Sequence, residues 1–571
     1  MAATLAVAGL TFSTSSRDPA EFTFVNAAEP ETLDPAHMTG HPEFRIAIEI
    51  FEGLTRRDAR TLRPVPGVAH TWVNSDDGLR WTFQLRDDAR WSNGKPVTAH
   101  DFVYSWLRLL DPKTGAKYAY LLGGLRGAAD FDGDTSGGFG IDRGVYALDD
   151  RTLVVELEAP IPYFLELTSF FSTFPVPRES VEAHGRGWFL PETIVGNGPF
   201  VLQSWRVGDR IRLSPNPEYW DLDAVALRSI DVLAIENPTT ALNLYLTGAV
   251  DWLPSLYPVE LADILRERDD FYSGASMIVY FYRLNTTRPP LDDPRVRRAL
   301  GLAIDRREIT EEVMRLGQLP AHTLVPPGMP GYSAPQSGFG FDVPRAQALL
   351  AEAGFPGGAG MREIGILYNT HEDHKKIAEV IADQLRRNLG VHVEAYNQEW
   401  QSYLASVDAQ DYDIARAGWI GDYMDPNTFL DMFVTDGGNN RTGWSDPAFD
   451  ALIAAAGNSA RAGRAPQALL ELAPEPAALL QRLVKLDAAG NPSARRDALA
   501  HFRLELLHQA ESLLVNRGYP VIPIYFYVSS GLVNPSVEGF YSELEFPDGS
   551  SGANLQDLHP LRDVRMRAGA R

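Results

Sequence analysis

Residues 367–393 read LYNTHEDHKKIAEVIADQLRRNLGVHV, and this stretch gives the clearest indication of the fold. Its apolar residues recur every three or four positions, which is the spacing of one face of an α-helix. Gly390 follows the last of them and is typical of a helix C-terminus, so we expect the helix to end there. Val391–Val393 then predicts a β-strand. The apolar stripe consists of Ile377, Val380, Ile381, Leu385 and Leu389.

The same alternation of helix and strand extends to both sides of this stretch. Pro344–Ala353 predicts a helix that Gly354 closes, and Tyr412–Gly418 predicts another strand. Upstream, Trp81–Leu85 alternates in the manner of a strand, and a helix is expected to begin near Ala99. Alternating helices and strands favour an α/β fold with a mixed sheet and flanking helices.

Composition excludes several classes of function. The chain has 571 residues, 75 acidic against 52 basic ones, a formal net charge of −23 and no cysteine. Such a negative charge repels phosphate backbones, so we expect no nucleic-acid partner. Without cysteine there is no thiolate catalysis, disulfide, cysteine-ligated zinc or iron–sulfur cluster. At about 100 to 200 residues per domain, the length predicts two to four lobes.

Two segments differ in composition from the rest of the chain. Residues 1–21 are expected to be the remnant of a secretory signal or a disordered leader, since they contain a short apolar run followed by small polar residues. Residues 456–498 are rich in Ala, Leu, Pro and Arg, and predict a surface helical hairpin or a mobile excursion. No stretch has the roughly 20 apolar residues of a membrane span, so we expect no direct span.

The sequence contains no complete motif for catalysis or metal binding. His371 and His374 are three residues apart, whereas zincins place two histidines at i and i+4, so we expect no metal site there. Asp130, Asp132 and Asp134 begin like a calcium loop, but the required glycine and bidentate glutamate do not follow. The nucleophile elbow, phosphate-binding loop and dinucleotide fingerprint are also missing. We therefore expect neither an enzyme nor a cofactor.

Several segments, taken in order, resemble the periplasmic oligopeptide-binding proteins of ABC importers, which belong to family 5 of the solute-binding proteins. The similarity covers nearly the whole chain, which makes it far more specific than a single motif. It rests on AEPETLDPAHMTGHPEFRIAIEIFE (28–52), WTFQLRDDARWSNGKPVTAHDFVYSW (81–106), GNGPFVLQSW (196–205), NPEYWD (216–221), DPRVRRALGLAIDR (293–306), LYNTHEDHKKIA (367–378), ARAGWIGDYMDP (415–426) and PIYFYV (523–528).

This resemblance implies a type II periplasmic-binding-protein fold, with two hinged lobes that close on a ligand and an additional third lobe. The hinge strands are expected to cross near Ser276 and Tyr527. The implied boundaries are 22–53, 178–277 and 527–571 for lobe I, 54–177 for the additional lobe II, and 278–526 for lobe III, which includes the insertion 456–498.

The family also implies a binding site for an extended peptide. Asp422, in the segment Trp419-Ile420-Gly421-Asp422-Tyr423, corresponds to the aspartate that meets the ligand ammonium, because a buried cation requires an anion. The strand Arg416, Ala417 and Gly418 would pair with the ligand backbone, as in strand addition. Tyr118 would lie near the amino end, and Arg416 and His374 near the carboxylate. Trp419, Tyr423, Tyr280 and Tyr525 complete the aromatic part of the expected site.

The chain departs from the family pattern at four positions. Thr39 and Arg283 stand where oligopeptide receptors tend to carry acids, and Met314 and Val407 replace basic residues. Fewer acids should weaken a preference for lysine-rich peptides, and fewer cations should disfavour longer ones. Di- or tripeptides, or a peptide-like metabolite such as a muropeptide, are therefore the expected ligands.

The function implied is a periplasmic, monomeric receptor that delivers a short peptide to the transmembrane subunits of an ABC permease. Two alternatives remain open at this point. One is a receptor for a non-peptide solute, such as a metal chelate, haem, a sugar or an antibiotic-like metabolite. The other is an enzyme or accessory protein that reuses the same fold, since fold does not determine function.

Overall fold

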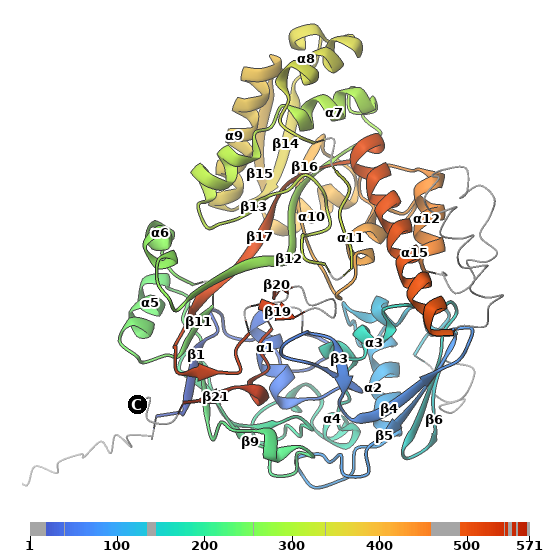
Figure 1. The fold of residues 1–571 in the computed structure, drawn as a ribbon, viewed down its shortest axis with the longest axis vertical. Coiled ribbons are helices and arrows are strands. Elements are labelled where there is room, and N and C mark those ends of the chain that lie inside the picture. Colours follow the sequence, from blue (N-terminus) through green and yellow to red (C-terminus); the bar gives the residue numbers. More distant parts are fainter. Residues whose placement is uncertain are drawn as a thin grey trace, which may run out of the picture.

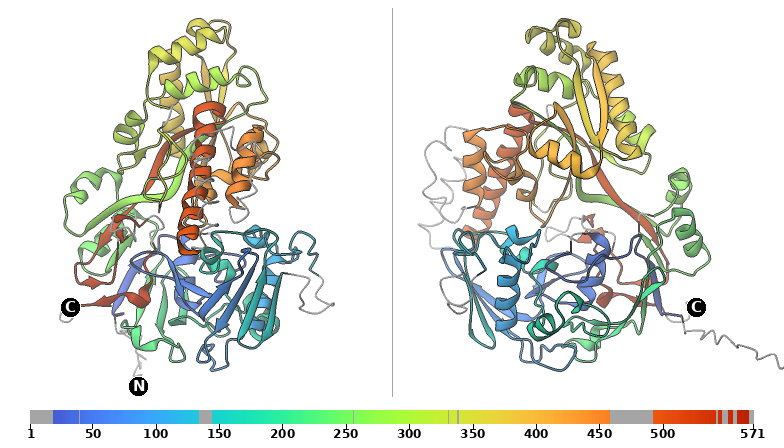
Figure 2. Two further views of the ribbon diagram at one scale, coloured as in Figure 1. Left: turned by 45° about the vertical axis from the view of Figure 1, so that its right-hand side comes forward. Right: turned by 180° about the vertical axis from the view of Figure 1, so that it is seen from behind.

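The computed structural model describes residues 19–38, 40–133, 144–254, 256–329, 331–336, 339–457, 492–541, 543–545, 551–554 and 558–567. Most of residues 1–21 and of the segment 456–498, for which the sequence made specific predictions, lie outside these ranges. The part of the segment that is described belongs to two helices, α12 (Pro447–Gly457) and α15 (Pro492–Leu513), which pack against each other (Figure 2).

An 11-stranded mixed sheet runs through the molecule. Its two longest strands, β12 (Phe271–Leu284) and β17 (Val521–Val533), pair antiparallel and pass obliquely from the upper half of the molecule to the lower half (Figure 1). Their register breaks between Ala275 and Val279, which leaves a bulge in β12. The two halves of the molecule are therefore joined by continuous strands with an irregularity in the middle.

The upper half extends this sheet from β12 and covers it with helices. The order here is β15 (Val393–Gln398), β14 (Ile364–Asn369), β16 (Ile414–Ile420), β12 and β17, and β13 (Leu319–Pro320) also pairs with β17. The helices of this half are α7 (Pro294–Leu302), α8 (Val343–Glu352), α9 (Glu372–Leu389), α10 (Trp400–Asp408) and α11 (Asn427–Leu430). The mixed sheet with flanking helices is confirmed.

Helix α9 confirms the prediction made from its apolar stripe. Its N-cap is His371, whose Nδ1 accepts a hydrogen bond from the Asp373 amide at 3.2 Å, and its C-cap Gly390 has a φ of 68°. The strand predicted at Trp81–Leu85 is confirmed as β5 (Arg80–Leu85), whereas the two strand predictions in the upper half were displaced by two residues. β15 begins at Val393 rather than Val391, because its partner β14 starts only at Ile364, which pairs with Val393. β16 likewise runs from 414 to 420 rather than from 412 to 418.

The lower half contains the other end of the large sheet and a separate four-stranded sheet. From β17 the large sheet continues through β11 (Trp252–Pro254), β1 (Phe22–Val25), β10 (Ile230–Leu233), β9 (Arg210–Pro215) and β8 (Phe200–Arg206). The small sheet has the order β4 (Ala69–Asn74), β5 (Arg80–Leu85), β7 (Thr152–Glu156) and β6 (Val145–Asp149). Helix α2 (Ala99–Leu110) packs against it and begins with a capping box, confirming the helix expected near Ala99.

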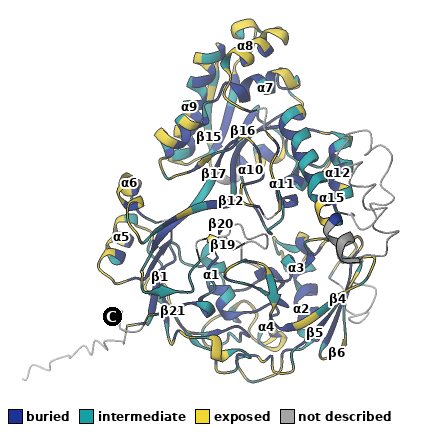
Figure 3. Ribbon diagram, viewed as in Figure 1, coloured by how far each residue is buried: buried dark blue, intermediate teal, exposed yellow. Residues whose placement is uncertain are grey.

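Buried residues form separate cores in the upper and lower halves of the molecule (Figure 3). One hydrophobic core draws its buried residues from 275–526, whereas another is built mainly from 22–252 and also includes Leu561 and Val564 near the C-terminus. The remaining elements are α1 (His41–Ile50), β2 (Thr55–Arg57), β3 (Pro64–Pro66), α3 (Phe164–Leu167), α4 (Arg178–His184), α5 (Pro238–Leu246), α6 (Ala262–Arg266), β18 (Val537–Glu538), β19 (Glu543–Glu545), β20 (Ser551–Ala553) and β21 (Arg565–Met566).

Candidate ligand-binding site

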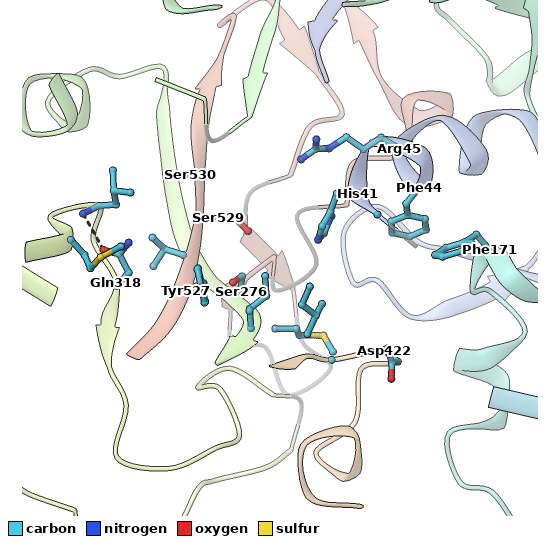
Figure 4. Close-up of a pocket in the computed structure, with 18 of the residues that line it drawn as sticks. His41, Phe44, Arg45, Phe171, Ser276, Gln318, Asp422, Tyr527, Ser529 and Ser530 are labelled. Atoms are coloured by element: carbon cyan, nitrogen blue, oxygen red, sulfur yellow. Dashed lines mark hydrogen bonds between the residues drawn. The ribbon is translucent and has the colours of Figure 1, made fainter. Parts of the chain in front are cut away.

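A cavity of about 480 Å³, the larger of the two described here, lies where the two halves meet at the bulge of β12. This larger cavity is bounded by α1 and the lower half on one side, and by the loop after β16 on the other (Figure 4). Ser276 and Tyr527, at the expected hinge, both line it, and the buried Ser276 hydroxyl has no hydrogen-bond partner among the described residues. The volume is typical of a site for a small organic ligand.

Asp422 supplies a carboxylate at one end of this cavity. It follows the Gly421 turn, which is fixed by a hydrogen bond from the Gly421 amide to the Met277 carbonyl at 2.7 Å. Its Oδ2 accepts a hydrogen bond from the Tyr120 hydroxyl at 2.7 Å, and no described cationic side chain pairs with it. Burial raises the pKa of Asp422 to about 6. The site thus holds an acid that would be stabilised by an added cation.

Aromatic side chains from the lower half form the wall beside Asp422. Tyr118 lies edge-on to Phe170 and Phe171, with ring centroids 5.2 and 5.6 Å apart. Burial, together with the charge of Asp422, raises the pKa of Tyr118 to about 12, so its hydroxyl remains a donor at neutral pH. Tyr118, expected near the amino end of the ligand, thus lines the larger cavity together with Asp422.

One edge of β16 is left without a partner strand in the described chain. β12 pairs with β16 along residues 414–420, but β14 pairs only with Ile414 and Ala415 on the opposite edge. The Arg416 carbonyl accepts a hydrogen bond from the Tyr403 hydroxyl, and the edge beyond it leads toward Asp422. Residues 417–420 therefore offer backbone groups to which an extended chain can add.

Arg416 lies in a cluster of tyrosines next to the larger cavity. Its guanidinium stands 4.8 Å from the ring centroid of Tyr280 and 3.4 Å from the hydroxyl of Tyr527, which itself lines the cavity. Tyr280 also stacks on Tyr525 at 4.8 Å. No described carboxylate pairs with Arg416, and its Nε is buried without a hydrogen-bond partner. This cluster can receive an anionic group.

His374 adjoins the same cluster but does not carry the charge expected of it. Its Nδ1 lies 3.5 Å from the Tyr280 hydroxyl. Burial, with the charge of Arg416 and the neighbouring His371, lowers the pKa of His374 to about 3. At neutral pH this imidazole would meet a carboxylate as a neutral hydrogen-bond donor and not as a cation.

The four positions that depart from the family pattern do not lie together at one site in the fold. Met314 lines the larger cavity. Val407 lies in a small separate core, and Arg283 is buried over the Phe281 ring, away from the cavities described here. Thr39 lies outside the described residues. Of these positions, Met314 alone is placed by the structure against the larger cavity.

A second cavity of about 360 Å³ adjoins the first, and Asp422 lines both. Trp419 and Tyr423, expected in the site, lie on this smaller cavity. Two residues that the sequence did not single out for the site also line it, namely Tyr120 and Asp431. Ala417 and Gly418 are in β16, where they pair with Phe281 and Tyr280.

The described residues include no group of three or more His, Asp or Glu side chains that could hold a metal ion. His371 instead serves as the cap of α9. A search of the described helices for a segment long and apolar enough to cross a membrane also finds none.

The model of the family described as bacterial extracellular solute-binding proteins, family 5 Middle, matches residues 63–441. The chain belongs to this family. The solute-binding protein is 37% identical over 524 residues to the periplasmic oligopeptide-binding protein OppA of Salmonella typhimurium, covering 90% of this chain and 88% of the relative. The resemblance drawn from the sequence segments is confirmed.

Solved structures agree with the sequence comparison. The solute-binding protein matches the periplasmic murein tripeptide binding protein MppA in its unliganded open form, with a TM-score of 0.74, 32% identity, and coverage of 96% of this chain and 98% of the other. It matches Haemophilus influenzae OppA in complex with RPPGFSPFR with a TM-score of 0.72, 32% identity, and coverage of 96% and 99%. The expected type II periplasmic-binding fold with several lobes is confirmed.

Proposed function

We propose that this protein is a periplasmic receptor that captures short peptides in extended form and delivers them to an ABC permease. The observation that carries the proposal is Asp422, an acid buried at the end of a ligand-sized cavity with no cationic partner in the described chain. The ammonium of a peptide would supply that partner. No chemical step is required of the protein.

The geometry supports an orientation for the peptide. Its ammonium would meet Asp422, its backbone would follow the open edge of β16 at residues 417–420, and its carboxylate would point to Arg416. Main-chain hydrogen bonds give affinity without dependence on side chains. Tyr118 would act as a hydrogen-bond donor near the amino end, with His374 as a neutral donor near the carboxyl end.

We further propose that the lobes are those implied by the family, with boundaries at 22–53, 54–177, 178–277, 278–526 and 527–571. The register break in β12 near Ser276 supports a hinge there, since a bulge weakens the ladder between paired strands. Closure stabilised by the peptide would be the signal that the permease reads, and a monomer suffices for it.

Mass spectrometry of the small molecules released by denaturing the protein, purified without stripping ligands, tests the proposal. A mixture of di- to tetrapeptides is the expected result, and a single non-peptide species would overturn it. A length series by calorimetry tests the expected preference for di- and tripeptides. That preference fails if pentapeptides bind about tenfold tighter than tripeptides, a difference of about 1.4 kcal/mol.

A further inference from the structure

The smaller cavity is walled by both halves of the molecule. Tyr120 and Tyr163 come from the lower half, and Trp419, Asp422 and Asp431 from the upper half. Tyr163 stacks on Tyr423 with ring centroids 4.0 Å apart and an interplanar angle of 9°. The cavity is thus enclosed by aromatic rings, with carboxylates among its lining residues.

Asp431 is the second acid of this cavity, and it resembles Asp422 in having no cationic partner among the residues that the structure describes. Its Oδ2 accepts hydrogen bonds from the Tyr423 hydroxyl at 3.2 Å and from Asn427 Nδ2 at 3.0 Å. The Met432 amide also contributes a backbone hydrogen bond to this carboxylate, so its donors are all uncharged. Arg503 pairs instead with Asp425 through two hydrogen bonds of 2.6 and 2.7 Å.

A third lining group, Trp419, is also incompletely satisfied. Its indole Nε1 is buried without a hydrogen-bond partner in the described chain. Buried polar atoms of native proteins almost always have a partner, so such an atom beside a cavity indicates a missing occupant. The rings of Trp419 and Tyr163 also provide surfaces that favour a cation.

The position of Asp422 on both cavities determines which part of a peptide would reach Asp431. With the ammonium on Asp422 and the backbone running along β16 past the larger cavity, the α-carbon of the first residue lies at the junction. Its side chain must then leave in a different direction from the backbone. The smaller cavity shares Asp422 with the larger one, and its volume of about 360 Å³ has the space for this side chain.

We infer that Asp431 is a specificity-determining residue that selects peptides whose first side chain carries a positive charge, such as lysine. The inference rests on the proposed function, because it requires the peptide ammonium on Asp422. Burial and the charge of Asp422 also raise the pKa of Asp431 to about 7, so the carboxyl gains from an added cation. The sequence analysis predicted instead a weaker preference for lysine-rich peptides. That prediction considered the acids that are absent at Thr39 and Arg283 and did not consider Asp431.

Calorimetry with two tripeptides tests the inference, Lys-Ala-Ala and norleucine-Ala-Ala at pH 7.5. Norleucine has nearly the shape of lysine without the ammonium, so the ratio of the two dissociation constants isolates the charge. We expect the wild-type protein to bind the lysyl peptide at least fivefold more tightly. Asp431→Asn should reduce this ratio to about one while still binding the norleucyl peptide measurably, which also shows that the variant is folded.

Asp436→Asn is the matched control, since it removes one negative charge five residues away at an exposed position that lines neither cavity. It should keep the wild-type ratio. Equal affinity of the wild-type protein for both peptides, or an unchanged ratio in Asp431→Asn, would overturn this inference and leave the peptide receptor intact. If neither peptide binds the wild-type protein, the proposed function fails and this inference fails with it.

Discussion

Asp422 has a largely desolvated carboxylate with no cationic partner among the described residues, which is costly for an isolated protein and reasonable for one that awaits a ligand. Asp422→Asn removes the anion but keeps the size of the side chain, so the ammonium of a bound peptide would lose its partner. We expect the affinity for a tripeptide to fall by at least about 2 kcal/mol, or about 30-fold in Kd. Calorimetry at pH 7.5 measures this loss. Unchanged affinity would favour a non-peptide solute.

The same residue predicts how binding depends on pH. The pKa of Asp422 is about 6 before binding, and a neighbouring ammonium would lower it. Protonation then competes with the ligand, and affinity decreases as the pH falls below that value, by up to about tenfold per pH unit. Leu-Ala-Ala is a suitable probe, because its neutral first side chain avoids Asp431. Titrations from pH 7.5 to 5 should show this slope, and Asp422→Asn should lack it.

How far the sequence predicts the site depends on whether a contact is local. One short segment contains Trp419, Asp422 and Tyr423. The resemblance of this segment to oligopeptide-binding proteins therefore locates all three residues at once. The hydrogen bond between Tyr120 and Asp422 joins residues 302 positions apart, so no spacing rule indicates it. Asp431 follows Asp422 by nine residues, but only the folded helix α11 brings both to one cavity.

At the scale of elements, the end of helix α9 was predicted more accurately than the bounds of the neighbouring strands β15 and β16. The end of α9 is marked by a glycine with a left-handed backbone, which is a local signal. The start of β15 is set by its partner β14, which is distant in sequence, and so it was misplaced by two residues. The continuity of β12 and β17 through both halves was expected only from the resemblance, because long-range pairing leaves no local pattern.

Helix α1 is hydrogen-bonded to the C-terminal segment through the buried acid Glu49. From this contact we predict how the stability of the protein depends on pH. Glu49 Oε1 accepts a hydrogen bond from the Leu561 amide at 2.9 Å, while Oε2 is buried without a partner in the described chain. Burial raises the pKa of Glu49 to about 8, so the folded state holds a proton that the unfolded state releases at lower pH. The stabilisation is complete below about pH 4.3 and is lost as the pH rises through 8.

Glu49→Gln mimics the protonated acid and should remove this dependence. Between pH 5 and 8 the free energy of unfolding of the wild-type protein should decrease relative to the variant by a few kcal/mol, at about 1.4 kcal/mol per pH unit. Urea unfolding at several pH values measures the difference. Glu31→Gln, at an exposed position, should behave like the wild type. Parallel curves for the wild type and Glu49→Gln would contradict the buried-acid argument.

At the scale of the whole molecule, the proposed closure of the lobes would depend on the contacts between the two halves. The Tyr163–Tyr423 stack and the Tyr120–Asp422 hydrogen bond connect them across the smaller cavity, in addition to the strands β12 and β17. A contact that exists only in the closed form stabilises that form and, through it, the bound state. Aromatic pairs of this kind contribute about 0.5 to 1.5 kcal/mol.

Tyr163→Leu therefore should shift the free protein toward an open form while leaving in place Asp422, Arg416 and the open edge of β16, to which the peptide main chain is assigned. Leu-Ala-Ala is the peptide to use, because its neutral first side chain does not depend on the aromatic face of Tyr163. We expect Kd to rise by about two- to tenfold, because fewer molecules are closed in advance. Small-angle X-ray scattering should show a larger radius of gyration for the variant without peptide, and equal values for both proteins when peptide is saturating. Tyr146→Leu, on β6 of the same half but outside both cavities, is the control and should match the wild type. If Tyr163→Leu changes neither the affinity nor the radius, the stack does not contribute to closure, and the hinge strands alone would set the balance between the two forms.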